Sequence, residues 1–79
     1  MSRPPDERLD LSGVPCPQNT ARALMALAIL DEGAVLELLL DDGEPVENVP
    51  PALELEGHTV QSRARTATGW RLTIVRGEE

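Results

Sequence analysis

The last third of the sequence alternates between apolar and polar residues with the period of a β-strand, and it does so twice. Residues 60–65 and 70–75 each show this pattern, and residues 66–69 lie between them. Gly69 tolerates the backbone angles of tight turns, so the segment predicts two strands joined as a hairpin. Trp70, Leu72 and Ile74 share the apolar side of the second strand, and we expect Trp70 to belong to the core.

The first part of the chain predicts a short strand and then a helix. Residues 8–12 alternate and are followed by Gly13-Val14-Pro15, which breaks the strand. Pro17 suits the first helical position, and residues 23–30 are rich in Ala, Leu and Met. We therefore expect a helix from Pro17 to a stop at residues 31–33.

The middle of the chain predicts a buried strand and a second helix. Residues 34–40 form an apolar run between Gly33 and a second turn, which is typical of a central strand. The helix lies between Pro45 and Gly57, and its start stays open because Pro50 either begins it or kinks it. The residues expected to face inward are Leu36, Leu38, Leu40, Val46, Val49, Leu53 and Leu55.

The order strand, helix, strand, helix, strand, strand predicts an α+β fold. We expect a two-layer α/β sandwich, β-α-β-α-β-β, with two helices packed on one face of a four-stranded mixed sheet. A single domain is expected over residues 8–76, with flexible tails at 1–7 and 77–79. A chain of 79 residues builds only a modest core, so we expect no bound cofactor and favour a carrier or adaptor over a self-sufficient enzyme.

The charge and the cysteine content limit the partners. The formal net charge is -7 and lysine is absent, so we expect no stable direct binding of nucleic acid. The sequence shows no signal peptide pattern and no apolar span that would cross a membrane. One cysteine excludes an internal disulfide, and a cytoplasmic location fits best.

The lone thiol, Cys16, is the leading candidate for chemistry. With Pro17 as the first helical residue, Cys16 takes the N-cap position, where unpaired N–H groups and the helix dipole favour the thiolate. Pro15 and Pro17 stiffen the chain on either side and display the side chain from a rigid turn. The alternative is that Cys16 is a small, buried and inert residue.

The sequence resembles the TusA/SirA-like sulfur carriers, and the resemblance covers roughly residues 8–76. It rests on an opening strand that leads into a Cys-Pro helix entry, and on shorter matches that follow in order. The matching segments are Leu9-Asp10-Leu11-Ser12-Gly13-Val14-Pro15-Cys16-Pro17, Ala26-Leu27, Asp31-Glu32-Gly33-Ala34-Val35-Leu36-Glu37, Asp41-Asp42, Val49-Pro50 and Gly57-His58.

The resemblance implies that Cys16 carries sulfur as a persulfide. A donor protein of the cysteine desulfurase or rhodanese type would load it, and an acceptor protein would receive the sulfur, so the chain would be a sulfurtransferase-type carrier. Because Cys16 has no neighbouring thiol in the chain, a two-cysteine redox relay is excluded. The alternative function is a non-catalytic interaction or regulatory module in which Cys16 is structural.

The sequence departs from the family pattern at two places. Asn19 stands where the second proline of the motif is expected, and its amide either hydrogen-bonds the sulfur or is an ordinary polar residue of the first turn. The first helix keeps only Arg22 where the family has several basic residues. Met25 and Ile29 exceed what one buried helical stripe requires. We expect them either to form an exposed patch that docks a partner or a second copy of the chain, or to be buried by a wide sheet.

Other polar residues are weaker candidates. His58 is expected to have an exposed or capping role, and no cluster has the spacing of a metal site. Residues 41–44 are expected to form a turn that caps the second helix. The strand arginines are expected to face solvent, with a small basic strip facing an acidic partner as the alternative; they are Arg63, Arg65 and Arg71.

Overall fold

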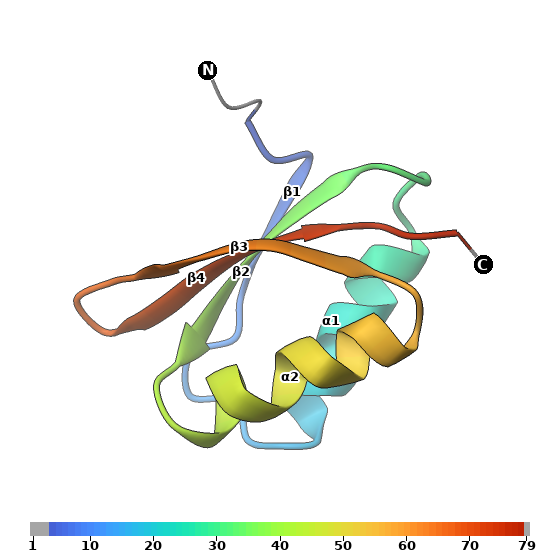
Figure 1. The fold of residues 1–79 in the computed structure, drawn as a ribbon. Helices are drawn as coiled ribbons and strands as arrows, with labels where there is room; N and C mark the ends of the chain where they lie inside the picture. The colour runs from blue at the N-terminus through green and yellow to red at the C-terminus, as the bar shows by residue number, and fades with distance from the viewer. Residues whose placement is uncertain (1–3, 79) are drawn as a thin grey trace.

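The computed structural model describes residues 4–78 and contains two helices and four strands in the expected order. Both helices lie on the same face of the sheet (Figure 1). The elements are β1 (Glu7–Asp10), α1 (Gln18–Ala28), β2 (Val35–Asp41), α2 (Glu44–Leu55), β3 (Thr59–Arg65) and β4 (Gly69–Val75). The expected α+β sandwich, with two helices on one face of a mixed sheet, is therefore confirmed.

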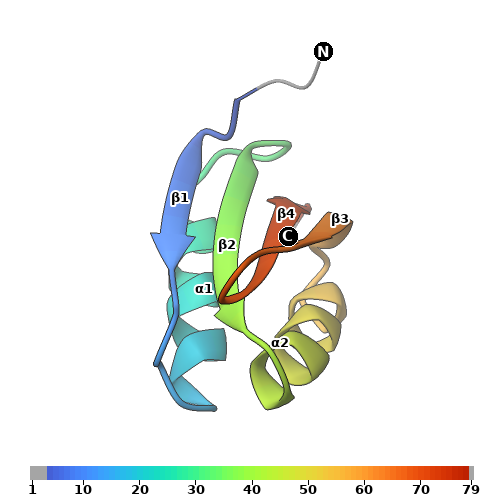
Figure 2. The same cartoon turned by 90° about the vertical axis from the view of Figure 1, so that its left-hand side faces the viewer.

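The order of the strands across the sheet is β1-β2-β4-β3. β1 pairs with β2 in parallel, and β4 pairs antiparallel with both β2 and β3. Because β1 and β2 are parallel, their carboxyl ends meet at one edge of the sheet, where α1 and α2 both begin (Figure 2). The loop that carries Cys16 follows β1 at this edge.

The core lies between the sheet and the helices, and it contains the predicted apolar positions except Leu55 and Trp70. The buried apolar residues are Leu11, Ala23, Leu27, Leu36, Leu38, Leu40, Val46, Val49, Leu53, Leu72 and Ile74. Leu55 is predicted to face inward and is 85% exposed, because it follows the buried Leu53 by two positions and so lies on the opposite face of α2.

The second helix begins earlier than Pro50. α2 starts at Glu44, with Pro45 in its first turn, where a missing N–H costs nothing. Pro50 and Pro51 lie inside the helix, and Pro50 is buried against the core. Of the two options that the sequence left open, a helix beginning at Pro50 is therefore wrong.

The ends of the elements differ from the predicted ones by one to three residues. β1 begins at Glu7 and ends at Asp10, whereas the alternation predicted residues 8–12. Asp6 donates its N–H to Val35 O and accepts the Val35 N–H on Oδ2, so the predicted tail of residues 1–7 reaches the sheet. Residues 1–3 and 79 of the predicted tails lie outside the described residues.

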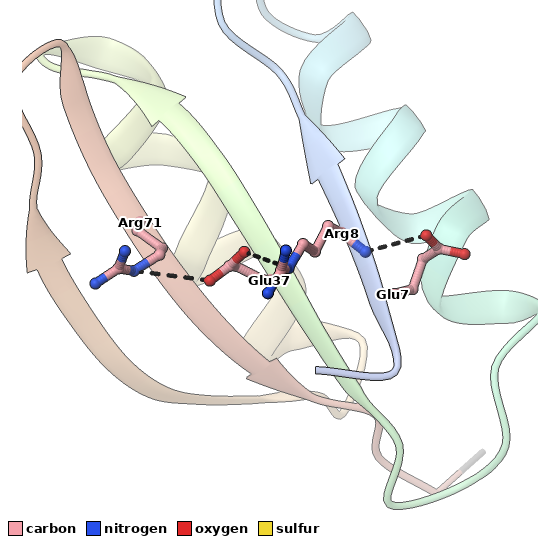
Figure 3. Close-up of polar contacts among 4 residues, drawn as sticks. All are labelled: Glu7, Arg8, Glu37 and Arg71. Carbon is pink, nitrogen blue, oxygen red and sulfur yellow. Dashed lines mark hydrogen bonds and ion pairs between the residues drawn. The ribbon is translucent and has the colours of Figure 1, made fainter. Parts of the chain in front are cut away.

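The uncovered face of the sheet carries a row of charged side chains. Glu37 on β2 pairs with Arg8 Nε of β1 at 3.1 Å and with Arg71 Nε of β4 at 3.7 Å (Figure 3). Arg65 pairs with Asp42 and lies over the ring of Trp70. Arg71 pairs with Ala64 on the uncovered face, whereas Arg63 and Arg65 pair with Leu72 and Trp70 on the other face. The three strand arginines therefore do not share one face, and the alternative of a single basic strip is wrong.

Trp70 is only partly buried, which corrects its assignment to the core. Its Nε1–H donates to Asp42 Oδ1 at 2.9 Å, so the ring packs against the core while its polar edge faces the surface. This hydrogen bond, more than any other interaction, holds the pKa of Asp42 below its ordinary value. Within residues 4–78, neither helix has the length and apolarity needed to cross a bilayer.

Candidate functional site

The loop between β1 and α1 displays Cys16 at the surface. Leu11 is buried and donates its N–H to Leu39 O, which continues the pairing of β1 with β2. Val14 donates its N–H to Leu11 O and packs against the core. Cys16 then follows as an exposed free thiol, so the alternative of a buried cysteine is wrong.

Asp41 at the end of β2 anchors this loop. Its Oδ2 accepts the N–H of Gly13 at 2.7 Å, across 28 positions of sequence. Gly13 has a φ of 76°, a conformation that residues with a side chain rarely adopt. The contact exists because the parallel pairing of β1 and β2 brings their carboxyl ends together, so Asp41 is a site residue that the sequence analysis did not identify.

Residues 42 and 43 form the expected turn, but the expected side-chain cap of α2 is absent. Gly43 is the N-cap of α2, and no side chain makes a capping hydrogen bond there. Asp41 instead binds the Cys16 loop, and Asp42 binds Trp70. The sequence pointed to these two residues only through the match of Asp41-Asp42 to the family pattern, and that match does not say which residues they contact.

Asp10 at the end of β1 also braces the loop. Its Oδ1 accepts the N–H of Ser12 at 2.9 Å. The hydrogen bonds from the side chain and the backbone of Ser12 lower the pKa of Asp10, so the carboxylate is held in its charged form. The first residues of the loop are thus fixed from both β1 and β2.

The helix begins one residue later than the sequence predicted. The N-cap of α1 is Pro17, so Cys16 lies just outside the helix, and the Cys16–Pro17 peptide bond is cis. The N–H of Asn19 donates to Pro15 O at 3.0 Å, and the N–H of Ala21 donates to Pro17 O at 3.1 Å. These N–H groups of the first turn are occupied by the loop and the helix and are not aimed at the sulfur.

The donor that reaches the sulfur belongs to Asn19. Its side chain is fully buried, at 0% exposure, and Nδ2 donates to Cys16 Sγ at 3.2 Å. Oδ1 accepts the N–H of Thr20 at 2.7 Å. Of the two interpretations of Asn19, the structure therefore supports the one in which its amide hydrogen-bonds the sulfur.

An exposed stripe runs along α1 to its C-cap, Ile29. Arg22, Met25 and Ile29 follow one another at helical spacing, and all three are exposed. Met25 is 69% and Ile29 is 80% exposed, because the inner side of α1 is filled by Asn19, Ala23 and Leu27. The sheet therefore does not bury the surplus apolar residues.

His58 does not belong to this site. It follows α2, whose end lies at the side of the molecule opposite the start of α1 (Figure 2). Its Nδ1 accepts the N–H of Gly77 at 3.1 Å, and partial burial, followed by the charge of Arg76, lowers its pKa. Its role is structural: it ties the end of β4 to the start of β3.

The geometry gives Cys16 one fixed donor and an open approach. A broad hollow lies on the uncovered face of the sheet, and its lining includes no residue of the Cys16 loop. Cys16 is therefore a surface thiol that lies outside this hollow and is open to groups on another molecule.

Comparison with known proteins supports a single family. The family model described as sulfurtransferase TusA matches residues 7–76. YedF, a candidate sulfur carrier protein of Escherichia coli strain K12, is 38% identical over 56 residues, which are 71% of this chain and 73% of YedF. YedF of Salmonella typhimurium matches equally. The crystal structure of a SirA-like protein from Desulfitobacterium hafniense superposes with a TM-score of 0.76 at 30% identity, covering 91% of this chain and 99% of that one.

Proposed function

The chain belongs to the TusA sulfurtransferase family, and from this membership we propose that it carries sulfane sulfur as a persulfide on Cys16 and passes it to an acceptor protein. In loading, the Cys16 thiolate attacks the outer sulfur of a donor persulfide. The new bond joins Sγ to that sulfur, and the donor cysteine leaves as a thiolate. Delivery is the same exchange with an acceptor thiolate as the attacking group.

The exposure of Cys16 carries this proposal. A carrier must present one sulfur to two proteins in turn, and Cys16 is exposed on a loop that Asp10 and Asp41 hold in place. The chain has no second cysteine that would attack the persulfide and release the sulfur. A purely structural cysteine gains nothing from this exposure, which counts against the alternative of an interaction module with an inert Cys16.

The exposed stripe of α1 serves as the docking surface for a donor or acceptor protein. Arg22 is the only charged residue of α1, in a chain whose formal net charge is -7. Arg22, Met25 and Ile29 therefore present an apolar surface with one positive charge on the helix that directly follows Cys16. A partner with apolar side chains and a carboxylate would complement it and would reach Cys16 at the same time.

Intact-mass measurement tests the proposed function. The purified chain is incubated with a cysteine desulfurase and cysteine, and separately with a rhodanese and thiosulfate. We expect a species heavier by one sulfur atom that disappears on reduction and does not form with Cys16→Ala. The absence of this species with both donor types would overturn the proposal.

A further inference from the structure

The backbone fixes which end of the Asn19 amide faces the sulfur. Oδ1 lies 2.7 Å from the backbone N–H of Thr20, and Thr20 Oγ1 lies 3.4 Å from the same oxygen. A backbone N–H only donates, so the amide atom beside it must be the oxygen. The other end, Nδ2, therefore faces Cys16 Sγ at 3.2 Å and can only donate.

We propose that Asn19 directs sulfur delivery by stabilising Cys16 Sγ as the leaving group, an inference that rests on the proposed function of Cys16. An acceptor thiolate can attack either sulfur of the persulfide. Attack on the outer sulfur joins it to the acceptor, breaks its bond to Sγ and leaves the electron pair on Sγ as the Cys16 thiolate. Attack on Sγ itself forms a mixed disulfide with Cys16 and expels the outer sulfur as hydrosulfide.

The two reactions place negative charge on different atoms. Only the productive attack develops charge on Sγ, where the Asn19 N–H already points. A hydrogen bond to a charged acceptor is stronger than one to a neutral acceptor, so the amide lowers the barrier of the productive attack more than that of the wasteful one. Because Asn19 is fully buried, its amide is already in place before the reaction and does not have to be ordered during it.

The product ratio of a chemically loaded persulfide tests this role. Cys16 is converted to the mixed disulfide with thionitrobenzoate, and sulfide displaces this group to leave the persulfide. Glutathione is then added as a monothiol acceptor, and intact mass at early times separates free chain, the productive result, from glutathionylated chain, the wasteful one. For Asn19→Leu we expect the ratio of productive to wasteful product to fall about fivefold, equivalent to about 1 kcal/mol.

Two further variants separate hydrogen bonding from structure. Asn19→Asp keeps the shape of the side chain but turns an oxygen toward Sγ, and we expect a ratio at least as low as that of Asn19→Leu. Thr20→Val keeps the backbone N–H that orients the amide, so its ratio should match the wild type. Circular dichroism identifies the variants that are folded.

The inference would be overturned if a folded Asn19 variant gave a ratio of productive to wasteful product within twofold of the wild-type ratio. If neither variant folds, the wild-type chain unfolded in urea gives the product ratio in the absence of the Asn19 hydrogen bond. The inference would also be overturned if the ratio of the folded wild type did not exceed that of the unfolded chain. Because the loading uses no donor protein, these outcomes are independent of the desulfurase and rhodanese experiment. Either result can therefore fail while the other stands.

Discussion

Removing the carboxylate of Asp41 should loosen the loop that carries Cys16. Asp41→Ala deletes the acceptor of the 2.7 Å hydrogen bond from the Gly13 N–H. The bond joins the loop to the end of β2, and β2 is anchored in the middle of the sheet by β1 and β4. The expected result is a lower free energy of unfolding and, within the folded state, more frequent opening of the loop.

The size of the effect follows from the charge and exposure of the bond. Hydrogen bonds to charged groups contribute about 1.5–3 kcal/mol, and this one lies at the lower end because Gly13 is exposed and Asp41 is half-buried. We expect Asp41→Ala to cost about 1.5 kcal/mol and Asp41→Asn, which keeps a neutral acceptor, to cost about half as much. In a domain of this size, each kcal/mol corresponds to about 4–8 °C in Tm.

Two measurements check the prediction. Urea unfolding followed by circular dichroism gives the free energy of unfolding, and amide hydrogen exchange of Gly13 reports the loop directly. We expect the Gly13 amide to exchange about tenfold faster in Asp41→Ala. Glu32→Ala is the matched control, because it removes one carboxylate from an exposed turn of the same chain and relieves the same net negative charge.

Equal stability of the Asp41→Ala and Glu32→Ala variants, together with unchanged exchange at Gly13, would refute the argument. Such a result would mean that the packing of Leu11 and Val14 holds the loop without help from the carboxylate. A loss of stability without faster exchange at Gly13 would place the effect of Asp41 elsewhere in the sheet.

Three further predictions concern other parts of the chain. Arg22→Glu should lower the rate of sulfur transfer with a protein donor or acceptor at least several-fold. Arg63→Glu makes an equal change of charge on β3 and should leave the rate unchanged. Transfer rates measured at low and high salt check both expectations. Arg76 donates from Nε to Leu27 O at 3.1 Å, so Arg76→Met should cost about 2 kcal/mol in urea unfolding, and Arg76→Lys should cost less because it keeps the charge. The lowered pKa of His58 means that the unfolded chain takes up a proton before the folded chain does, so stability should fall as the pH drops below about 6.5. His58→Gln should flatten this slope between about pH 5.5 and 7, above the range in which carboxylates titrate, and an unchanged slope would contradict the assignment.

The strands could be predicted because apolar residues recur along the sequence with a regular spacing. Alternation and apolar runs identified every strand, because a strand with one buried face must alternate. The strand order was not accessible, since it depends on which apolar faces pack best in three dimensions. Helix ends were displaced for a local reason: Pro17 is compatible both with the first helical position and with the N-cap before it.

The site was only partly predictable, for the same physical reason. Cys16 and Asn19 lie three positions apart, so a turn at the helix entry brings them together, and sequence spacing suggests the contact. Asp41 is 28 positions from Gly13, and only the parallel pairing of β1 and β2 joins them. Local contacts can therefore be read from a sequence of this kind, whereas contacts that depend on strand order cannot.

In the sulfur transfer that we propose, the chain and its partner protein contribute different parts of the site around Cys16. The chain fixes the loop through Asp41 and supplies one hydrogen-bond donor through Asn19, while Cys16 itself remains exposed. Water competes with the amide for charge on Sγ, so the hydrogen bond is weakest in the free carrier. A protein docked on the stripe of α1 would exclude that water and strengthen the bond at the moment of transfer. Docking and leaving-group stabilisation are therefore expected to act together, and the effect of replacing Asn19 should be larger with a protein acceptor than with glutathione.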